Sequence, residues 1–200
     1  MIRDDGSQQY GIFARRFTER AHEILAGECE GSADELLGLC DDYSWLMDEC
    51  RNSLQRRLGA ALIFAVDGYN PVKFVMAHEA FGPGEAGGIR PDFGTIVYPH
   101  GAIAGHTVDF LFTTWVKGLA ACTVVRCEEQ TSQEQDAATL AQGKERDQRL
   151  ALEGARILSF TAVDIESDLP GCIAEVEEVL GHQIDRLMIQ AGISSMPERH

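Results

Sequence analysis

Residues 107–130, TVDFLFTTWVKGLAACTVVRCEEQ, contain two apolar runs separated by Lys117-Gly118. Their β-branched and aromatic residues predict two strands, and the glycine permits a tight reversal between them. Asp109 falls inside the first predicted strand, and Glu128 ends the second. A carboxylate inside an apolar strand has two explanations, which are solubility at a sheet edge and a metal site.

Pairing of the two strands would bring Asp109 and Glu128 together near one end of the sheet. Alternate side chains share a face, so Asp109 groups with Leu111, and Glu128 groups with Arg126. Two carboxylates with a backbone carbonyl and water suit a hard cation such as Mg²⁺. That ion would generate a nucleophilic water and neutralise phosphate charge. The alternative is that Asp109 faces solvent and Glu128 begins a loop.

The segments around this stretch predict an α/β fold with a mixed sheet flanked by helices. A short strand (TIVYP) precedes it across a glycine-containing connection. A helix over 132–153 follows, with a capping box at Ser132 and a stop at Gly154. The strand ARILSFTAVDI and a closing helix with Pro170 in its first turn complete the order.

The N-terminal part is predicted to be helical. A helix over 7–27 ends at EGS, and a capping box from Ser32 to Glu35 starts a second helix whose apolar series runs to Leu58. Two short apolar runs then flank DGYNP, which predicts a hairpin or a strand and an edge. We expect a helical portion (1–60) packed on an α/β core (61–190), and a flexible tail (191–200).

Composition is that of an ordinary globular chain of 200 residues, with 44% hydrophobic and 24% charged residues. No apolar run is long enough to span a bilayer, and MIRDDGSQQY lacks a signal region, so we expect a cytoplasmic protein without membrane association. The chain has six cysteines and no CxxC pair. Buried free thiols are therefore predicted rather than disulfides or zinc ligands.

The formal net charge is -15, from 17 basic and 32 acidic residues. Proteins that bind nucleic acid rely on Lys and Arg to displace counterions from phosphates. The charge therefore weakens the case for tight binding to naked duplex DNA. It leaves open binding through a local basic patch, through metal ions or within a complex.

The second half of the chain resembles the PD-(D/E)xK nuclease superfamily, in the branch related to very-short-patch repair endonucleases. That branch has a strand ending in V-D-F, an apolar strand with an acidic end, a helix with R-D and leucine, a G…vlRFT strand and an acidic helix. The resemblance covers residues from about His100 to Leu180. The matching positions are 108–110, 124–128, 146–147, Leu150, Gly154 and 157–161.

The resemblance implies a restriction-endonuclease-like fold and Mg²⁺- or Mn²⁺-dependent hydrolysis of DNA phosphodiester bonds. Asp109 and Glu128 would hold the metal. The sequence departs from the family where its glutamate is expected, because Arg126 stands there. A shifted alignment gives Glu128-Glu129-Gln130, in which Gln130 replaces the usual lysine. Glutamine can orient a water but carries no positive charge.

Other residues are candidates for chemistry from the pattern alone. His100 and His106 could form a metal cluster with Asp109 or act as general acids. Lys144, Arg146 and Arg149 could contact phosphate, although the interleaved Glu145 and Asp147 make helix-surface salt bridges equally plausible. Glu79 could be a further ligand or an exposed strand end, and Arg90-Pro91-Asp92 is expected to form a loop turn.

Three functions are consistent with these patterns. The first is a metal-dependent DNA endonuclease with Asp109, Glu128 and Gln130 as catalytic residues. The second is a catalytically inactive nuclease-fold protein that serves as an accessory or regulatory protein-binding subunit. The third is a small-substrate metal hydrolase built on His100, His106 and Asp109. DNA, a protein partner and a second copy of the chain are the candidate partners.

Overall fold

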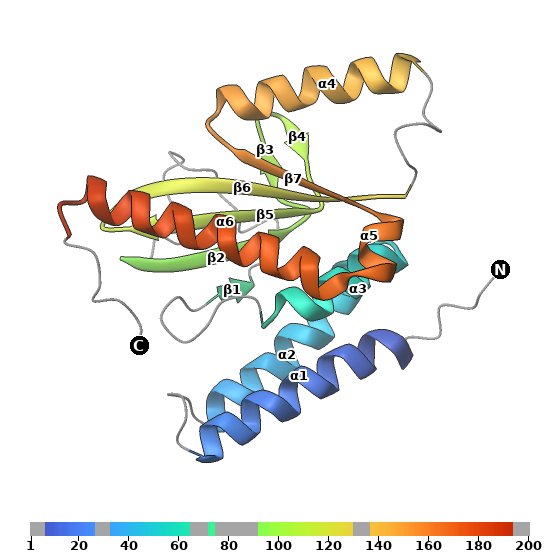
Figure 1. The fold of residues 1–200 in the computed structure, drawn as a ribbon, viewed down its shortest axis with the longest axis vertical. Helices are drawn as coiled ribbons and strands as arrows, with labels where there is room; N and C mark the ends of the chain where they lie inside the picture. Colours follow the sequence, from blue (N-terminus) through green and yellow to red (C-terminus); the bar gives the residue numbers. More distant parts are fainter. Residues whose placement is uncertain (1–6, 27–32, 65–71, 75–91, 130–136, 194–200) are drawn as a thin grey trace.

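The computed structural model describes residues 7–26, 33–64, 72–74, 92–129 and 137–193 (Figure 1). Its helices and strands form a mixed α/β fold, which confirms the predicted class. The helices are α1 (Ser7–Ala26), α2 (Ala33–Glu49), α3 (Ser53–Leu62), α4 (Ala137–Leu152), α5 (Ala162–Ser167) and α6 (Leu169–Gln190). The strands are β1 (Val72–Phe74), β2 (Phe93–Pro99), β3 (Ala102–Ile103), β4 (His106–Thr107), β5 (Phe110–Val116), β6 (Leu119–Glu128) and β7 (Arg156–Thr161).

The main sheet is five-stranded in the order β1-β2-β5-β6-β7, with β1 contributing only three residues. β2, β5 and β6 are antiparallel neighbours, whereas β7 is parallel to β6 and β1 is parallel to β2. The predicted reversal between β5 and β6 is confirmed. Lys117 and Gly118 both adopt positive φ there, at 50° and 82°.

The strand predicted to contain Asp109 is interrupted, which corrects one expectation. β4 ends at Thr107 and β5 begins at Phe110. Backbone bonds at the break are local, because Val108 N donates to Gly101 O at 2.9 Å and His100 N donates to Asp109 O at 2.9 Å. These bonds close the small β3–β4 hairpin and place Asp109 just before the strand.

The helix predicted from Leu36 to Leu58 is two helices. α2 ends at Glu49, and Asn52 caps α3 by accepting a hydrogen bond from Gln55 N at 2.8 Å. An N-cap side chain of this kind satisfies first-turn amides and favours a new start. α3 continues to Leu62, and Ile63 and Phe64 form a turn, so no strand forms over residues 61–64, where the first strand of a hairpin was expected. The rest of that apolar run lies outside the described residues. The helical spacing buries Leu58 and Leu62 on one face instead.

The strand predicted over 155–165 ends at Thr161. Thr161 and Asp164 form a capping box that begins α5, because the Thr161 side chain accepts from Asp164 N while the Asp164 carboxylate accepts from Thr161 N. Gly154 stops α4 with φ 77°, and Pro170 lies in the first turn of α6, as predicted. The expected capping residues Ser32 and Ser132 lie outside the described residues.

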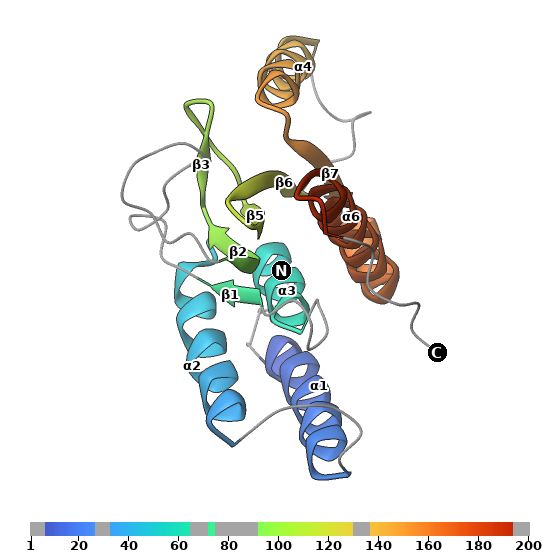
Figure 2. The same ribbon diagram turned by 90° about the vertical axis from the view of Figure 1, so that its left-hand side faces the viewer.

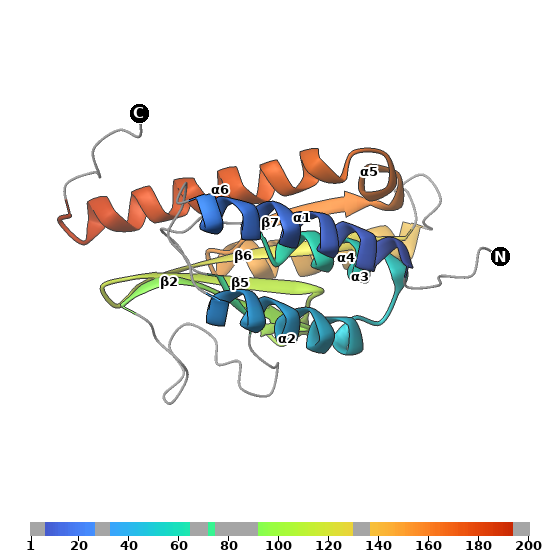
Figure 3. The ribbon, with the colours of Figure 1, turned by 90° about the horizontal axis from the view of Figure 1, so that it is seen from below.

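Two apolar cores lie on the two faces of the sheet. On one face, α3, α5 and α6 bury residues that include Leu58, Phe110 and Val125, and α1 and α2 pack on α3 as an outer layer (Figure 2). Seen from below, α1 and α2 extend in the same general direction as α6 (Figure 3). The opposite core joins Leu111 and Val124 to the β3–β4 hairpin and to Leu150 of α4.

Several other predictions can be compared with the described residues. Cys40, Cys50, Cys122, Cys127 and Cys172 are free thiols, as expected. No helix in the described ranges is long and apolar enough to cross a membrane. The division at residue 60 falls within α3 and remains a prediction, as does the separate tail.

Candidate functional site

The carboxylate of Asp109 is held by two neutral donors at the start of β5. Its Oδ1 accepts from Gln55 Nε2 at 2.6 Å, and its Oδ2 accepts from Cys127 N at 2.7 Å. Gln55 is 5% exposed and is positioned in the first turn of α3 by the Asn52 cap. We call Asp109, Gln55 and Cys127 the Asp109 cluster. Both carboxylate oxygens in it have a protein partner.

The Asp109 cluster includes the thiol of Cys127, and the thiol of Cys50 is buried nearby. Burial is the main cause that raises the pKa of Cys50 to about 12; Asp109 and Glu49 add to this rise, and Arg56 opposes it. The pKa of Cys127 is raised mainly by burial and then by Asp109. Both thiols are therefore protonated near neutral pH in the protein without bound metal.

Arg126 lies at the end of β6, is 8% exposed and has several partners. Its guanidinium forms a two-pronged ion pair with Asp147 of α4, with Nη1–Oδ1 at 3.0 Å and Nη2–Oδ2 at 3.1 Å. Nη2 also donates to Ser159 Oγ of β7 at 2.8 Å and lies 3.8 Å from Glu128 Oε1. We call Arg126, Asp147, Ser159 and Glu128 the Arg126 cluster. The contacts of this cluster connect α4 to the end of β6 and to β7.

Asp109 and Arg126 lie opposite each other in the register of β5 and β6, but their side chains bind different elements. Phe110 pairs with Val125, so the antiparallel register continues to Asp109 opposite Arg126. The carboxylate of Asp109 nevertheless binds α3, whereas Arg126 binds α4 and β7. Glu128 contacts Arg126. The carboxylates predicted to share a metal thus each have a different protein partner.

The metal site itself remains a prediction. Within the described ranges, no group of three or more His, Cys, Asp or Glu side chains is arranged to hold an ion. Asp109 and Glu128 with waters would be a smaller ligand set than that. Gln130, the third predicted catalytic residue, lies outside the described residues, as do Glu79, Arg90 and Pro91.

The two histidines lie at opposite ends of the β3–β4 hairpin. His100 Nε2 is 2.9 Å from the carbonyl oxygen of Glu49, which can only accept, so this nitrogen carries a proton and donates. His106 Nε2 is buried and has no hydrogen-bond partner among the described residues. His100 therefore donates a hydrogen bond to the end of α2. Within the described residues, His100, His106 and Asp109 do not form a common metal-binding group.

The basic residues of α4 make the salt bridges that the sequence left as one alternative. Arg149 and Glu145 are paired at 2.6 Å, and Arg146 Nε lies 3.8 Å from Asp147 Oδ1. Lys144 is exposed. The predicted phosphate contacts of Lys144 and Arg146 stay predictions.

Gln55 and Ser159 were missed by sequence reasoning. Gln55 stands three residues after Asn52, a spacing that indicates a helix start, but its partner Asp109 is 54 residues away. Ser159 stands at the position where the resembled family has arginine, and the bond from Arg126 joins the adjacent strands β6 and β7, in which the two residues are register partners. No local pattern signals either contact, because both depend on how the sheet assembles.

No protein-family model, no curated protein and no solved structure matches this chain. The fold and the two clusters therefore carry the functional reasoning.

Proposed function

We propose that the chain is a nuclease-fold protein of the PD-(D/E)xK type that does not cleave DNA and acts as an accessory protein-binding subunit. The resemblance calls for a strand ending in V-D-F, an apolar strand with an acidic end, a helix with R-D and a further strand. The order of β6, α4 and β7 is consistent with the last three, whereas Val108 and Asp109 precede β5 and Phe110 begins it. The mixed α/β architecture supports this proposal at the level of the fold.

The pairing of Arg126 with Asp147 is the observation that carries the proposal. Arg126 occupies the position where the resemblance expects a metal-binding glutamate. A guanidinium has no acceptor, so it cannot ligate a cation, and its positive charge opposes one. Its contacts with Asp147, Ser159 and Glu128 give this arginine a structural role.

Two further features favour an inactive protein. Gln55 and Cys127 already donate to both oxygens of Asp109, so the carboxylate is satisfied by the protein. The net charge of -15 opposes a polyanionic substrate and favours a partner with a basic surface. An accessory subunit is consistent with both.

A Mg²⁺- or Mn²⁺-dependent DNA endonuclease is the second candidate, and the strand register favours it. Asp109 and Glu128 lie at the same end of adjacent strands, and a carboxylate has lone pairs beyond the two that Asp109 uses. In this mechanism both residues would hold the metal, and Gln130 would orient the attacking water. Lys144 and Arg146 would contact phosphate.

A cleavage assay separates the two candidates. Plasmid and single-stranded DNA are incubated with Mg²⁺ or Mn²⁺ and with wild type, Asp109→Ala, Glu128→Ala and the exposed control Glu153→Ala. The proposal predicts no cleavage above buffer in any sample. Cleavage by wild type and Glu153→Ala that both site variants lose would overturn it and establish the endonuclease.

The accessory role is tested by affinity capture with the full chain. We expect one stoichiometric protein partner that high salt releases, because charge drives the contact. A chain that neither cuts DNA nor retains any stoichiometric partner would contradict this role.

A further inference from the structure

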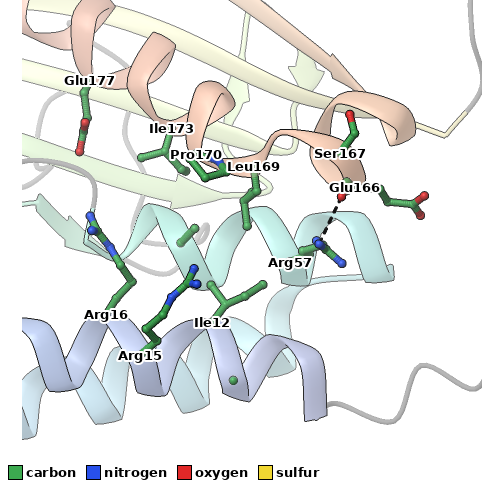
Figure 4. A pocket seen from close by; sticks show the side chains of 12 residues that line it. Ile12, Arg15, Arg16, Arg57, Glu166, Ser167, Leu169, Pro170, Ile173 and Glu177 are labelled. Carbon is green, nitrogen blue, oxygen red and sulfur yellow. Dashed lines mark hydrogen bonds between the residues drawn. The ribbon is translucent and has the colours of Figure 1, made fainter.

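A cavity of about 730 Å³ lies where α1 and α3 meet the junction of α5 and α6 (Figure 4). None of the residues of the Asp109 cluster or the Arg126 cluster lines it, although its Arg57 follows Gln55 by two residues on α3. Ligand pockets for small molecules typically enclose about 300–1,000 Å³. The cavity therefore has the size of a small-molecule site.

One wall of the cavity is apolar. It is formed by Ile12 of α1, Ala61 of α3, and Leu169 and Ile173 of α6. Ala61, Leu169 and Ile173 are 6%, 9% and 7% exposed and belong to the core of this face. Rigid packing behind the wall supports a preformed surface for a hydrocarbon group.

Three arginines line the same cavity, and they come from two helices. Arg15 and Arg16 extend from α1 toward α6, and Arg57 extends from α3 (Figure 4). Arg57 Nη2 lies 3.5 Å from the carbonyl oxygen of Glu166, which orients its guanidinium at the end of α5. Arg16 has an exposed ion pair with Glu19 at 3.5 Å. Arg15 makes no hydrogen bond or ion pair with any described residue.

The charge balance at the cavity differs from that of the whole chain. Its lining includes three arginines against Glu166 and Glu177, whereas the chain as a whole carries -15. Leu169 and Pro170 bring the first turn of the 22-residue helix α6 to the same place, but the Asp168 carboxylate caps this turn by accepting from Gly171 N, so the arginines supply the positive charge. The cavity is thus a locally positive site on an acidic protein.

We propose that this cavity binds a small anionic amphiphile, with its phosphate or carboxylate on Arg15, Arg16 and Arg57 and its apolar body on Ile12, Leu169 and Ile173. Guanidinium groups match the planar, two-oxygen face of phosphate and carboxylate. The apolar wall beside them selects against small hydrophilic anions. This site is independent of the proposed accessory role.

Calorimetric titration of the full chain tests the site with octyl phosphate, octanoate, 1-octanol and inorganic phosphate. Saturable binding of one octyl phosphate or one octanoate per chain, at least about tenfold tighter than binding of 1-octanol or inorganic phosphate, is expected, since one charge-assisted bond is worth about a factor of ten. Preference between the first two probes identifies the headgroup. Equal binding of 1-octanol, or no saturable binding of either anion, would overturn the proposal.

Matched arginine variants locate the site. Arg15→Gln should lower the affinity for octyl phosphate or octanoate about tenfold or more, since it removes one charged donor from the cavity. Arg186→Gln removes the same charge from an exposed position on α6 and should leave the affinity unchanged. Arg15 is exposed, so its loss should not unfold the chain. Equal effects of the two substitutions would place binding elsewhere and contradict the assignment.

Discussion

The Asp109 cluster and the Arg126 cluster occupy the same end of the sheet and satisfy their charges in different ways. Asp109 keeps a single negative charge on two neutral donors, a side-chain amide and a backbone amide. Arg126 is a nearly buried cation whose charge is matched by Asp147 and Glu128. The comparison shows that neutral donors hold Asp109, whereas opposite charges hold Arg126, whose buried Nε has no hydrogen-bond partner among the described residues.

Removal of the Asp109 carboxylate should have the largest effect on stability. Asp109→Ala leaves the Gln55 amide and the Cys127 N–H without their acceptor, and each unsatisfied buried donor costs about 1–3 kcal/mol. We expect the free energy of unfolding to fall by about 2–4 kcal/mol in total. Chemical denaturation measures it, with the exposed Asp48→Ala as control. A loss no greater than that of the control would show that these two bonds contribute little.

Removal of the Asp147 charge should have a smaller effect. Asp147→Asn weakens a pair whose arginine side chain is 10% exposed but whose carboxylate is 39% exposed, so solvent screens it. We expect a loss of about 1–2 kcal/mol, between the values for surface and buried pairs. Because the interaction is ionic, high salt should reduce the difference from wild type. The loss of stability in Asp109→Ala should not depend on salt. A salt-dependent loss in Asp109→Ala together with a salt-independent loss in Asp147→Asn would contradict the distinction between the two clusters.

Alkaline pH should destabilise the fold through the buried thiols. Burial raises the pKa of Cys50 to about 12 and that of Cys122 to about 11, from a value of 9.0 in the unfolded chain. A raised folded pKa means that this stability is fully present below pH 9.0 and is lost as pH rises toward the folded pKa. The loss is about 1.4 kcal/mol per pH unit for each such thiol.

Denaturation at pH 8, 9 and 10 for wild type, Cys50→Ala and Cys122→Ala checks this prediction. Each variant should show a shallower alkaline loss than wild type by the contribution of one thiol. Cys50 lies beside the Asp109 cluster and Cys122 lies on the opposite face, so equal changes would show that burial rather than Asp109 sets both pKa values. Identical slopes in all three proteins would contradict the assignment.

The capping box at Thr161 should have the smallest effect. Thr161→Ala removes the N-cap of the six-residue helix α5, two residues beyond Ser159, and caps are worth about 0.5–2 kcal/mol. We expect a loss of about 0.5–1 kcal/mol, because the helix is short. The hydrogen bonds from Thr161 lower the pKa of Asp164. The stabilisation that the Asp164 carboxylate adds to the folded state is therefore present above its unfolded pKa and is lost as pH falls through its folded pKa.

Urea denaturation of Thr161→Ala at neutral and acidic pH measures both effects. The difference from wild type should shrink at acidic pH, once Asp164 is protonated in both proteins. A loss larger than that of Asp147→Asn would show that α5, rather than the Arg126 cluster, controls the stability of this end of β7.

The sequence predicts elements whose determinants are local. The Lys117-Gly118 turn, the Gly154 stop and Pro170 in the first turn of α6 all follow from the conformational preferences of single residues. The β3–β4 hairpin and the break before β5 were missed, because bonds between residues seven and nine apart compete with an apolar strand pattern. The break between α2 and α3 was missed because the apolar series continues across it. Asn52, which caps α3, is the one local signal of a new helix there.

Contacts within the two clusters were not predictable from the sequence. The sequence predicted that Asp109 and Glu128 would meet near one end of the sheet, since period-two alternation and a tight turn constrain the register of the two strands. It did not indicate that Gln55 would bind Asp109 or that Ser159 would bind Arg126. These partners come from α3 and β7, whose approach to the strand ends depends on packing of the whole domain.

The central proposal is that Gln55 and Cys127, rather than a metal ion, satisfy Asp109. The most direct test is an NMR titration of the full chain with Mn²⁺ in which the backbone amide signals are recorded. A bound paramagnetic ion broadens the signals of nearby amides. We predict no saturable broadening at the amides of Phe110 and Cys127, and none that differs between wild type and Asp109→Asn. Saturable broadening of these two amides by one Mn²⁺ per chain, abolished in Asp109→Asn, would contradict the claim and restore the endonuclease.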